Sequence, residues 1–458
     1  MFSVNRGLCT HGHATVHHPG ADRPRQSHHH HCPSSQYPSN REAVRVKVPG
    51  RDFLCPPVLD DLLYQFWRGL QDELAPWEEL NKIIEFRSNE LIWTAEEIGL
   101  WSLEYKRELT SPLCIAAAQG FSDCLQYLLE HGARPNLVAG GRTALHEACL
   151  NSTTDCAEIL LEYGANPNQC TEDGLSPLHL CKTEQSLRCA KLLVRYGADV
   201  NRMSEEEEES PLQVAAKLGL QQHVQLYLRY GAQANHQNST GETALCAACG
   251  GARGDLEEEQ EENYLKVCRF LFEYGANVNK VDKERRSPLH KAARNAQYRL
   301  VELLVERGAE INTPDYNGCS PLSNALQTAE VHHKSRPHAM VQMLLNHGSI
   351  KVWPGALLKV LSSCASTPKT VEVMFNSYDT VPVTYKWFDA IPEEAYKANP
   401  AFYASLFALE NNVRCLQHHC RSALRKHFGK DCHALIPRLP IPNLLKSYLL
   451  LDPEGVVY

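Results

Sequence analysis

The chain has 458 residues, of which 43% are hydrophobic and 22% charged, an ordinary globular composition that excludes a collagenous or wholly disordered protein. At a typical domain size of roughly 150 residues, this length predicts about three domains. Its 46 basic and 54 acidic residues leave a formal net charge of −8, so the chain as a whole gives no electrostatic reason to expect a nucleic-acid partner.

Hydropathy and cysteine usage indicate an intracellular chain. No stretch approaches the roughly 18 consecutive apolar residues of a membrane span, and the first thirty residues or so lack the apolar run of a secretory signal. The 18 cysteines are spread from Cys9 to Cys432, mostly within apolar helical patterns, so we expect reduced, buried thiols. We therefore predict no membrane contact and a cytoplasmic protein that can also be present in the nucleus.

Residues 1–45 hold eight of the 22 histidines among Ser, Pro, Gly and Arg, with almost no aliphatic residues. This composition predicts disorder. Histidine-rich tracts can bind transition metals, but no cysteine or carboxylate lies at a spacing that would complete a specific site, so we predict no metal site.

Residues 46–105 are predicted to be a helical N-terminal extension that covers the first face of the domain that follows it. Apolar residues recur there at spacings of three and four, which is the helical period. They are Leu59, Leu62, Leu63, Phe66 and Leu70, followed by Leu80, Ile83, Ile84 and Phe86.

Glycines recur through the middle of the chain at a nearly constant spacing. Seven of them are separated by 32, 33, 34, 44, 33 and 40 residues, and each has a Ser-Pro-Leu or Thr-Ala-Leu signature upstream. Seven copies at a period near 33 indicate a repeat architecture. The glycines are Gly132, Gly164, Gly197, Gly231, Gly275, Gly308 and Gly348.

The chemistry of the unit predicts two helices per repeat. A Ser or Thr such as Ser210 caps a first helix that begins with Pro or Ala. A second helix carries an apolar pair such as Leu160 and Leu161, and a glycine such as Gly164 ends it in a left-handed cap. An asparagine such as Asn168 then starts the loop to the next copy. The unit and its period resemble the ankyrin repeat over residues 106–352, which implies an all-α solenoid of about seven repeats.

Two copies are longer than the others, the fifth by 11 residues and the seventh by 7, and both insertions are predicted to fall between the two helices. The fifth contains the acidic run Glu257–Glu262, and Glu205–Glu209 form a second run before the fourth repeat. These runs either recognise a basic segment of a partner or are solvated acidic loops.

Residue types that serve catalysis occur in the repeats, but not in a catalytic arrangement. His146, His179 and His290 hold the same place in three repeats with no nucleophile beside them, so we expect them to form hydrogen bonds within the repeat turns. Cys246 and Cys249 form a CxxC, yet no second pair lies at zinc-binding distance. We expect no catalytic residue, metal or cofactor, and the binding of another protein as the default activity of the repeats.

Residues 353–401 contain apolar helical segments at 356–361 and 370–375, interrupted by Pro368 and Pro382. Prolines end helices because they lack an N–H group and clash with the preceding turn. This region is interpreted as a degenerate repeat or as connecting helices.

Residues 402–458 carry two motifs. The first is an amphipathic helix whose apolar residues are four apart and therefore share one face, which can enter a partner's groove. The second is an apolar turn that cannot continue a helix, followed by the apolar run 444–451. The helix residues are Leu416, Cys420 and Leu424, and the turn residues are Leu439, Pro440, Ile441 and Pro442.

In this order and at this spacing the two motifs resemble the SOCS box. In that family, a helix with Leu, then Cys four residues later, then an aliphatic residue binds the elongin B and elongin C pair, and an LPxP turn favours cullin 5. The resemblance places the elongin contact on Leu416, Cys420 and Leu424 and the cullin 5 contact on residues 439–442. His419 departs from the pattern, since the family often has an aliphatic residue there, and this change could weaken affinity without changing the binding mode.

An ankyrin array followed by a SOCS box is the arrangement of the ankyrin repeat and SOCS box family, and the resemblance covers residues 100–458. It implies a C-terminal three-helix SOCS box and a non-catalytic substrate-recognition adaptor. The ankyrin surface would bind an unidentified target protein, while the SOCS box would bind elongin C, elongin B and cullin 5 with its RING partner, which leads to ubiquitination of the target. The alternative is an ankyrin scaffold outside any ubiquitin ligase, whose terminal helices pack only on its own repeats.

Overall fold

The computed structural model describes residues 44–48, 51–55, 80–95, 101–254, 256–410 and 412–458. The chain divides into a first unit, Met1–Glu42, and a second unit, Ala43–Tyr458, and all described residues belong to the second. Of the segment 1–45 that was predicted to be disordered, residues 1–43 with the histidine-rich tract lie outside the described part, and the prediction is wrong for residues 44 and 45, which begin a strand. The apolar series from Leu59 to Leu70 also lies outside the described part.

The N-terminal part of the second unit contains strands. β1 (Val44–Val48) pairs antiparallel with β2 (Arg51–Cys55), and β3 (Ile84–Ala95) pairs antiparallel with β4 (Trp101–Thr110). The prediction of a helical N-terminal cap over residues 46–105 is therefore wrong for these four segments.

The prediction failed because the spacing of apolar residues in this region was interpreted as the period of a helix. Trp101, Leu103 and Tyr105 alternate with polar residues in β4, and Ile84 and Phe86 alternate with acidic or basic ones at the start of β3. Alternation with a period of two, in residues that are aromatic or β-branched, favours a strand over a helix.

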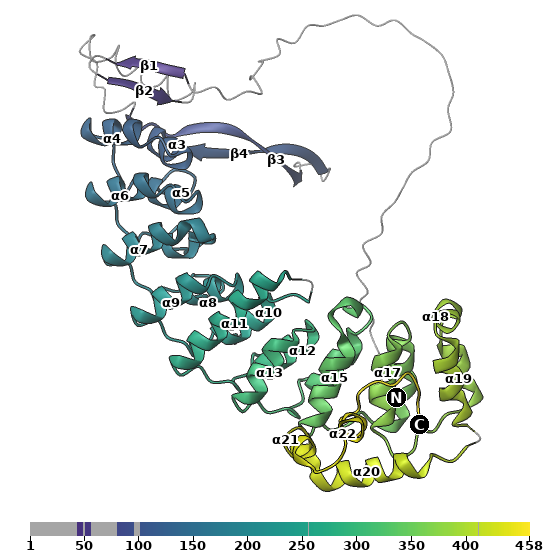
Figure 1. The fold of residues 1–458 in the computed structure, drawn as a ribbon. Helices are drawn as coiled ribbons and strands as arrows, with labels where there is room; N and C mark the ends of the chain where they lie inside the picture. Colours follow the sequence, from purple (N-terminus) through teal and green to yellow (C-terminus); the bar gives the residue numbers. More distant parts are fainter. Residues whose placement is uncertain (1–43, 49–50, 56–79, 96–100, 255, 411) are drawn as a thin grey trace, which may run out of the picture. The chain divides into compact units, whose positions relative to one another are not determined.

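Seven helix pairs follow, in the order that the repeats predict, and Figure 1 shows consecutive pairs side by side. The third pair begins with a short 3₁₀ helix in place of an α-helix. The pairs are α3 (Pro112–Gln119) with α4 (Ser122–Glu130), α5 (Ala144–Leu150) with α6 (Thr154–Glu162), η1 (Pro177–Leu180) with α7 (Leu187–Arg195), α8 (Pro211–Lys217) with α9 (Gln221–Arg229), α10 (Ala244–Gly251) with α11 (Glu258–Glu273), α12 (Pro288–Arg294) with α13 (Tyr298–Glu306), and α14 (Pro321–Gln327) with α15 (Pro337–Asn346).

The helix ends have the predicted chemistry. At the start of α8, the Ser210 hydroxyl accepts from the Gln213 N–H, which satisfies one of the donors that a helix leaves unpaired. At the end of α6, Gly164 has φ +84° and the next amide, of Ala165, donates to the Leu160 carbonyl at 2.9 Å. A left-handed residue at this place favours glycine because it has no Cβ.

Asparagines join each repeat to the next. The Asn136 amide donates to the Gly164 carbonyl at 3.1 Å, and its oxygen accepts from the Asn166 N–H at 2.7 Å. The predicted loop asparagines therefore have a second role, as links along the stack. The same pair of bonds recurs at Asn168, Asn201, Asn235, Asn279 and Asn312.

An eighth helix pair continues the stack, because α16 (Leu357–Cys364) packs beside α14 and α17 (Pro368–Asn376) packs beside α15. The short helices η5 (Tyr385–Ala390), α18 (Glu393–Ala398) and α19 (Pro400–Ala408) follow. Within the described residues, no helix is both long enough and apolar enough to cross a membrane.

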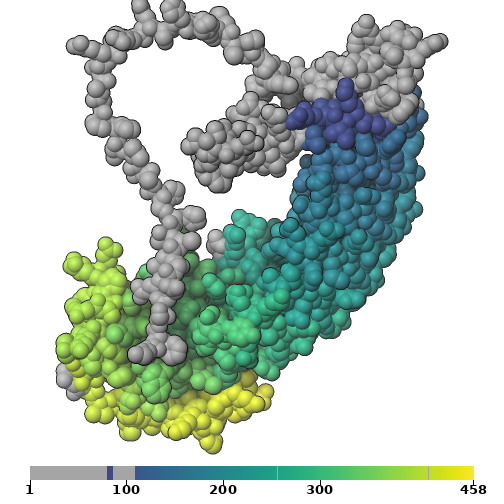
Figure 2. All heavy atoms as spheres, turned by 180° about the vertical axis from the view of Figure 1, so that it is seen from behind, coloured from purple at the N-terminus to yellow at the C-terminus, as the bar shows by residue number. Residues whose placement is uncertain are grey.

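Three α-helices with two short 3₁₀ turns complete the chain. Their small core consists of Cys432, Ile436 and Leu449. In Figure 2 these C-terminal residues, in yellow, lie directly against the green residues of the preceding helices. The helices are α20 (Leu416–Phe428), η6 (Gly429–Asp431), α21 (Cys432–Leu435), η7 (Ile436–Arg438) and α22 (Asn443–Leu449).

Candidate functional site

Helix α20 presents its apolar stripe to the outside. The Leu416 residue is 79% exposed and Leu424 is 39% exposed, and Cys420 between them is also exposed. The three residues share one face because they are four apart. Since an apolar stripe normally packs into the core, its exposure leaves a surface on which a partner can dock.

The opposite face of α20 is buried although it is polar. Arg414, His418 and Arg421 are each less than a tenth exposed, and Arg425 follows four residues after Arg421. The spacing of three and four places His418, Arg421 and Arg425 on one side of the helix, and Arg414 precedes the helix by two residues. The amphipathic pattern is thus reversed, with basic residues against the protein and leucines outside.

Two of these arginines bind the ends of stacked helices. The Arg414 guanidinium donates to the Phe375 carbonyl at 3.0 Å, near the end of α17. Arg425 donates to the Asn346 side chain at 2.6 Å and to the Leu345 carbonyl at 3.3 Å, at the end of α15. Helix C-termini carry unpaired carbonyls and partial negative charge, which favour a cation there. Burial lowers the pKa of both guanidinium groups to about 10, so both remain charged at neutral pH.

His418 and Arg421 complete the buried face. The His418 Nε2–H donates to the Tyr378 carbonyl at 2.8 Å, so its Nδ1 accepts from the Arg421 guanidinium at 2.9 Å. Burial, and then the charges of the neighbouring arginines, lower the pKa of His418 to about 4, which keeps the ring neutral. The Arg421 guanidinium also lies over the Tyr448 ring, at 4.2 Å from its centre, and 5.6 Å from that of Tyr458.

The apolar turn has two inward and two outward residues. Leu439 and Ile441 are partly buried and pack against the small core of the C-terminal helices, whereas Pro440 and Pro442 are exposed. The Pro442 carbonyl accepts from the Lys446 N–H at 3.1 Å and starts α22. The turn therefore packs on the small core through Leu439 and Ile441, whereas the leucines of the stripe on α20 are exposed.

The last residues of the chain bind α17 through a buried carboxylate. The Glu372 side chain is 2% exposed and accepts from the backbone N–H groups of Glu454 at 2.5 Å and Gly455 at 3.0 Å. Asn376 donates to the Val456 carbonyl at 3.0 Å and accepts from the Tyr458 N–H at 3.0 Å. These bonds connect the segment after α22 to the eighth helix pair.

Sequence reasoning named the outer stripe but missed the residues that orient it. The signal was present in the sequence, because the basic residues from Arg414 to Arg425 repeat at helical spacing opposite the leucines. Glu372 gave no such signal, since its partners are backbone groups about 80 residues away.

The repeat histidines are structural hydrogen-bonding groups, as predicted. The His146 Nδ1 accepts from the Thr143 N–H at 3.1 Å, and its Nε2–H donates to the Gln169 carbonyl at 2.9 Å. His179 and His290 make the same bonds in their own repeats. Burial lowers the pKa of His146 to about 4, which keeps the ring neutral as this geometry requires.

The CxxC cysteines are buried in the packed helix α10, where burial raises the pKa of Cys246 to about 11. Among the residues that the structure describes, fourteen cysteines are free thiols, whereas Cys124 is disulfide-bonded, so the expectation of reduced thiols is wrong at Cys124. In the part of the chain that the structure describes, no group of three or more His, Cys, Asp or Glu side chains could hold a metal ion.

Comparisons with known proteins give the same two modules. A family model of ankyrin repeats matches in five overlapping segments between residues 97 and 353, and a model of the SOCS box matches residues 412–450. Among solved structures, the ankyrin repeat domain of human ASB11 is 30% identical, covers 49% of this chain and 96% of that domain, and aligns with a TM-score of 0.43.

Three relatives match over most of the chain. Human ankyrin repeat and SOCS box protein 18 is 47% identical over 401 residues, 85% of each chain. Mouse protein 16 is 42% identical over 93% of this chain and 90% of its own length, and human protein 10 is 44% identical over 79% and 78%. On this similarity, and with both modules in the expected order, the chain belongs to the ankyrin repeat and SOCS box family.

Proposed function

We propose that this chain is the substrate-recognition adaptor of a ubiquitin ligase built on elongin B, elongin C and cullin 5 with its RING partner. A SOCS box in this family implies a substrate-adaptor role in a cullin ubiquitin ligase. In this proposal, elongin binds Leu416, Cys420 and Leu424, and cullin 5 binds residues 439–442. The ankyrin surface binds the target protein.

The observation that carries the proposal is the reversed amphipathicity of α20. A terminal helix that served only the stability of the repeats would bury its leucines, yet Leu416 is among the most exposed apolar residues described, at 79%. The arginines opposite it hold the helix against α15 and α17, so the stripe is presented in one orientation. A preorganised surface binds with a smaller loss of conformational entropy than a disordered one.

The chain acts by proximity. It performs no bond chemistry, because the ubiquitin thioester is carried by a conjugating enzyme that the RING partner recruits. By holding the target and the ligase together, it raises the effective concentration of target lysines near that thioester. The links through Arg414 and Arg425 matter here, since they join the target-binding repeats to the surface that binds the ligase.

Co-expression of the full chain with elongin B and elongin C, followed by size-exclusion chromatography, tests the proposal. We expect a stable ternary complex that is lost in the double variant Leu416→Ala, Cys420→Phe, because a large ring at residue 420 cannot occupy a pocket that accepts a thiol. Lys426→Phe is the matched control: it also introduces Phe at an exposed position of α20, but on another face of the helix, and should keep the complex. A wild-type chain that elutes alone as a soluble monomer would refute the adaptor role and favour the scaffold alternative.

A further inference from the structure

A cavity of about 320 Å³ opens across the first helices of four consecutive repeats. Its wall includes Lys217 at the end of α8, Ala247 and Gly250 on α10, and Lys291 and Arg294 on α12. It lies on the ankyrin part of the chain, apart from the stripe on α20.

The cavity exists because the fifth repeat has small residues where its neighbours have long ones. Counted from the capping Ser or Thr, the seventh residue is Lys217 in the fourth repeat, Gly250 in the fifth and Arg294 in the sixth. The fourth residue is Ala247 in the fifth repeat and Lys291 in the sixth. A Cβ added at Gly250 would meet only the Lys291 side chain, at 3.5 Å, an ordinary contact, so the backbone there tolerates a side chain directed into the hollow.

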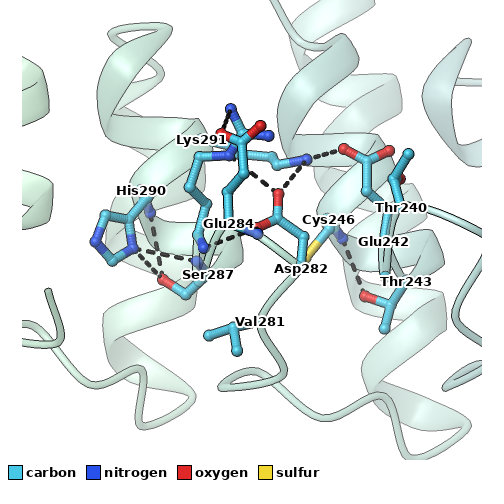
Figure 3. A network of polar contacts seen from close by, with 12 residues as sticks. Thr240, Glu242, Thr243, Cys246, Val281, Asp282, Glu284, Ser287, His290 and Lys291 are labelled. Atoms are coloured by element: carbon cyan, nitrogen blue, oxygen red, sulfur yellow. Dashed lines mark hydrogen bonds and ion pairs between the residues drawn. The ribbon is translucent and has the colours of Figure 1, made fainter. Parts of the chain in front are cut away.

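The long side chains around the hollow are basic, and two of them, Lys291 and Arg286, form ion pairs with nearby carboxylates. Figure 3 shows Lys291 reaching Glu242, to which it donates, and Asp282, whose carboxylate lies at 3.5 Å. Arg286 pairs with Asp282 at 3.0 Å and with Glu284 at 2.9 Å.

The two remaining cations have no such partner. Lys217 and Arg294 are exposed and make no ion pair within the described part of the chain. The lining therefore has four cations and the single carboxylate of Glu242, in a chain whose net charge is −8. The Lys291 network holds one wall of the hollow in place. Lys217, which interacts electrostatically with the Glu209 carboxylate, and Arg294 stand at its two sides without a direct ion pair.

We propose that this hollow docks an acidic segment of the target protein. The peptide backbone would run over Ala247 and Gly250, with carboxylates bound by Lys217 on one side and by Arg294 on the other. This inference rests on the proposed function and deepens it. It assigns target binding to this hollow of the ankyrin repeats and predicts that the bound target segment is acidic.

A carboxylate peptide fits the site better than a nucleic acid. The hollow is local, and the same repeats carry the acidic runs Glu205–Glu209 and Glu257–Glu262. Binding of an extended phosphate backbone needs a long basic surface, which these acidic runs disfavour, whereas a short acidic segment of a folded protein need only cover the hollow.

Fluorescence anisotropy with the full chain tests the inference. The probe is a fluorescein-labelled peptide of alternating Glu and Gly. The same peptide with Gln in place of Glu shows how much of the binding affinity depends on the carboxylate charge. We expect the Glu peptide alone to bind, and binding to weaken with salt. Lys217→Glu with Arg294→Glu should reduce the affinity about tenfold or more, since a tenfold loss corresponds to 1.4 kcal/mol.

Two further variants distinguish binding in the hollow from nonspecific attraction to positive charge on the protein surface. Gly250→Gln fills the hollow without changing the charge and should also weaken binding. Arg195→Glu with Arg229→Glu makes the same change of charge in the last turns of α7 and α9, the second helices of their repeats, and should leave binding unchanged. Equal loss in this control, or equal binding of the Gln peptide, would overturn the inference.

The same preparations are tested for elongin binding. A chain that forms the elongin complex but does not bind the Glu peptide refutes the docking site and leaves the adaptor role intact. A chain that binds the peptide but not elongin refutes the adaptor role alone. A single-stranded RNA that binds more tightly than the peptide, and is lost in the same variants, would overturn the assignment to a protein segment.

Discussion

The guanidinium of Arg421 lies 4.2 Å from the centre of the Tyr448 ring. This contact joins the buried face of α20 to α22, across the turn that carries the two exposed prolines. The Arg421 side chain has few other partners: one nitrogen meets His418, and its buried Nε has no hydrogen-bond partner. Arg425, one helical turn later, has three oxygen partners.

The two arginines should therefore differ in what their loss costs. Methionine has a similar length and no charge, so it preserves packing while it removes the hydrogen bonds. Arg425→Met leaves the Leu449 carbonyl and the Asn346 side-chain oxygen without this donor, while the Leu345 carbonyl keeps its bond from the Gly348 N–H, and it should lower local stability by about 2 to 4 kcal/mol. Arg421→Met loses a cation–π contact of about 2 kcal/mol but also relieves the burial of a charge, so the net loss should be smaller.

Hydrogen exchange of the α20 and α22 amides measures this difference. Exchange should be faster in Arg425→Met than in Arg421→Met, while the amides of α5 and α6 in the second repeat should not change in either variant. Equal protection of α20 in both variants would contradict the role given to the helix-end bonds.

The neutral repeat histidines predict a loss of stability in acid. Burial lowers the pKa of His146 and His179 from 6.5 to about 4, so between these values the unfolded state binds more protons than the folded state. The free energy of unfolding should therefore fall as the pH drops from about 6.5 toward 4, and stay level above 6.5 as far as these groups are concerned. Each ring contributes up to about 3 kcal/mol to this change.

Glutamine can replace these histidines, because the fourth repeat already uses it. Gln213 accepts from the Ser210 N–H at 2.8 Å and donates to the Glu242 carbonyl at 2.7 Å, and its amide does not titrate. His146→Gln with His179→Gln should reduce the drop in melting temperature between pH 7 and pH 5. The control variant, His333→Gln with His427→Gln at exposed positions, should show the wild-type drop in melting temperature. If it changes this pH dependence as much as the variant of the buried histidines does, the buried histidines are not its cause.

The fold was predictable where local chemistry repeats, and less so where distant segments meet. The period, the caps and the role of His146 follow from residues within one repeat. The strand β4 was missed because Trp101 and Leu103 alternate over too few residues to outweigh the helical pattern before them. The shared face of Leu416, Cys420 and Leu424 was predictable from their spacing, whereas only the resemblance to the SOCS box implied that this face binds a partner. The contact of Arg425 with α15 was not predictable, since it depends on how the last helices meet.

Thiol labelling can test the proposed elongin contact directly. Cys415 and Cys420 are exposed, whereas burial raises the pKa of Cys114 to about 11 and that of Cys364 to about 12, so the buried pair should react slowly because thiolate is the reactive form. In the free chain, iodoacetamide should label both Cys415 and Cys420. Elongin should protect Cys420 and leave Cys415 reactive, as resolved by peptide mass spectrometry. Equal labelling of Cys420 with and without elongin would contradict its place in the contact.

The proposed cullin contact at residues 439–442 can be tested separately from the folding of the box. Pro440 and Pro442 are exposed, whereas Leu439 and Ile441 pack on the core formed by Cys432 and its neighbours. Pro440→Ala with Pro442→Ala should keep the elongin complex but weaken capture of cullin 5 about tenfold or more. Leu439→Ala should weaken both, because it also removes packing from the box. Pull-down of purified cullin 5 on the preformed elongin complex measures the two effects, and full cullin capture by the double proline variant would exclude these prolines from the contact.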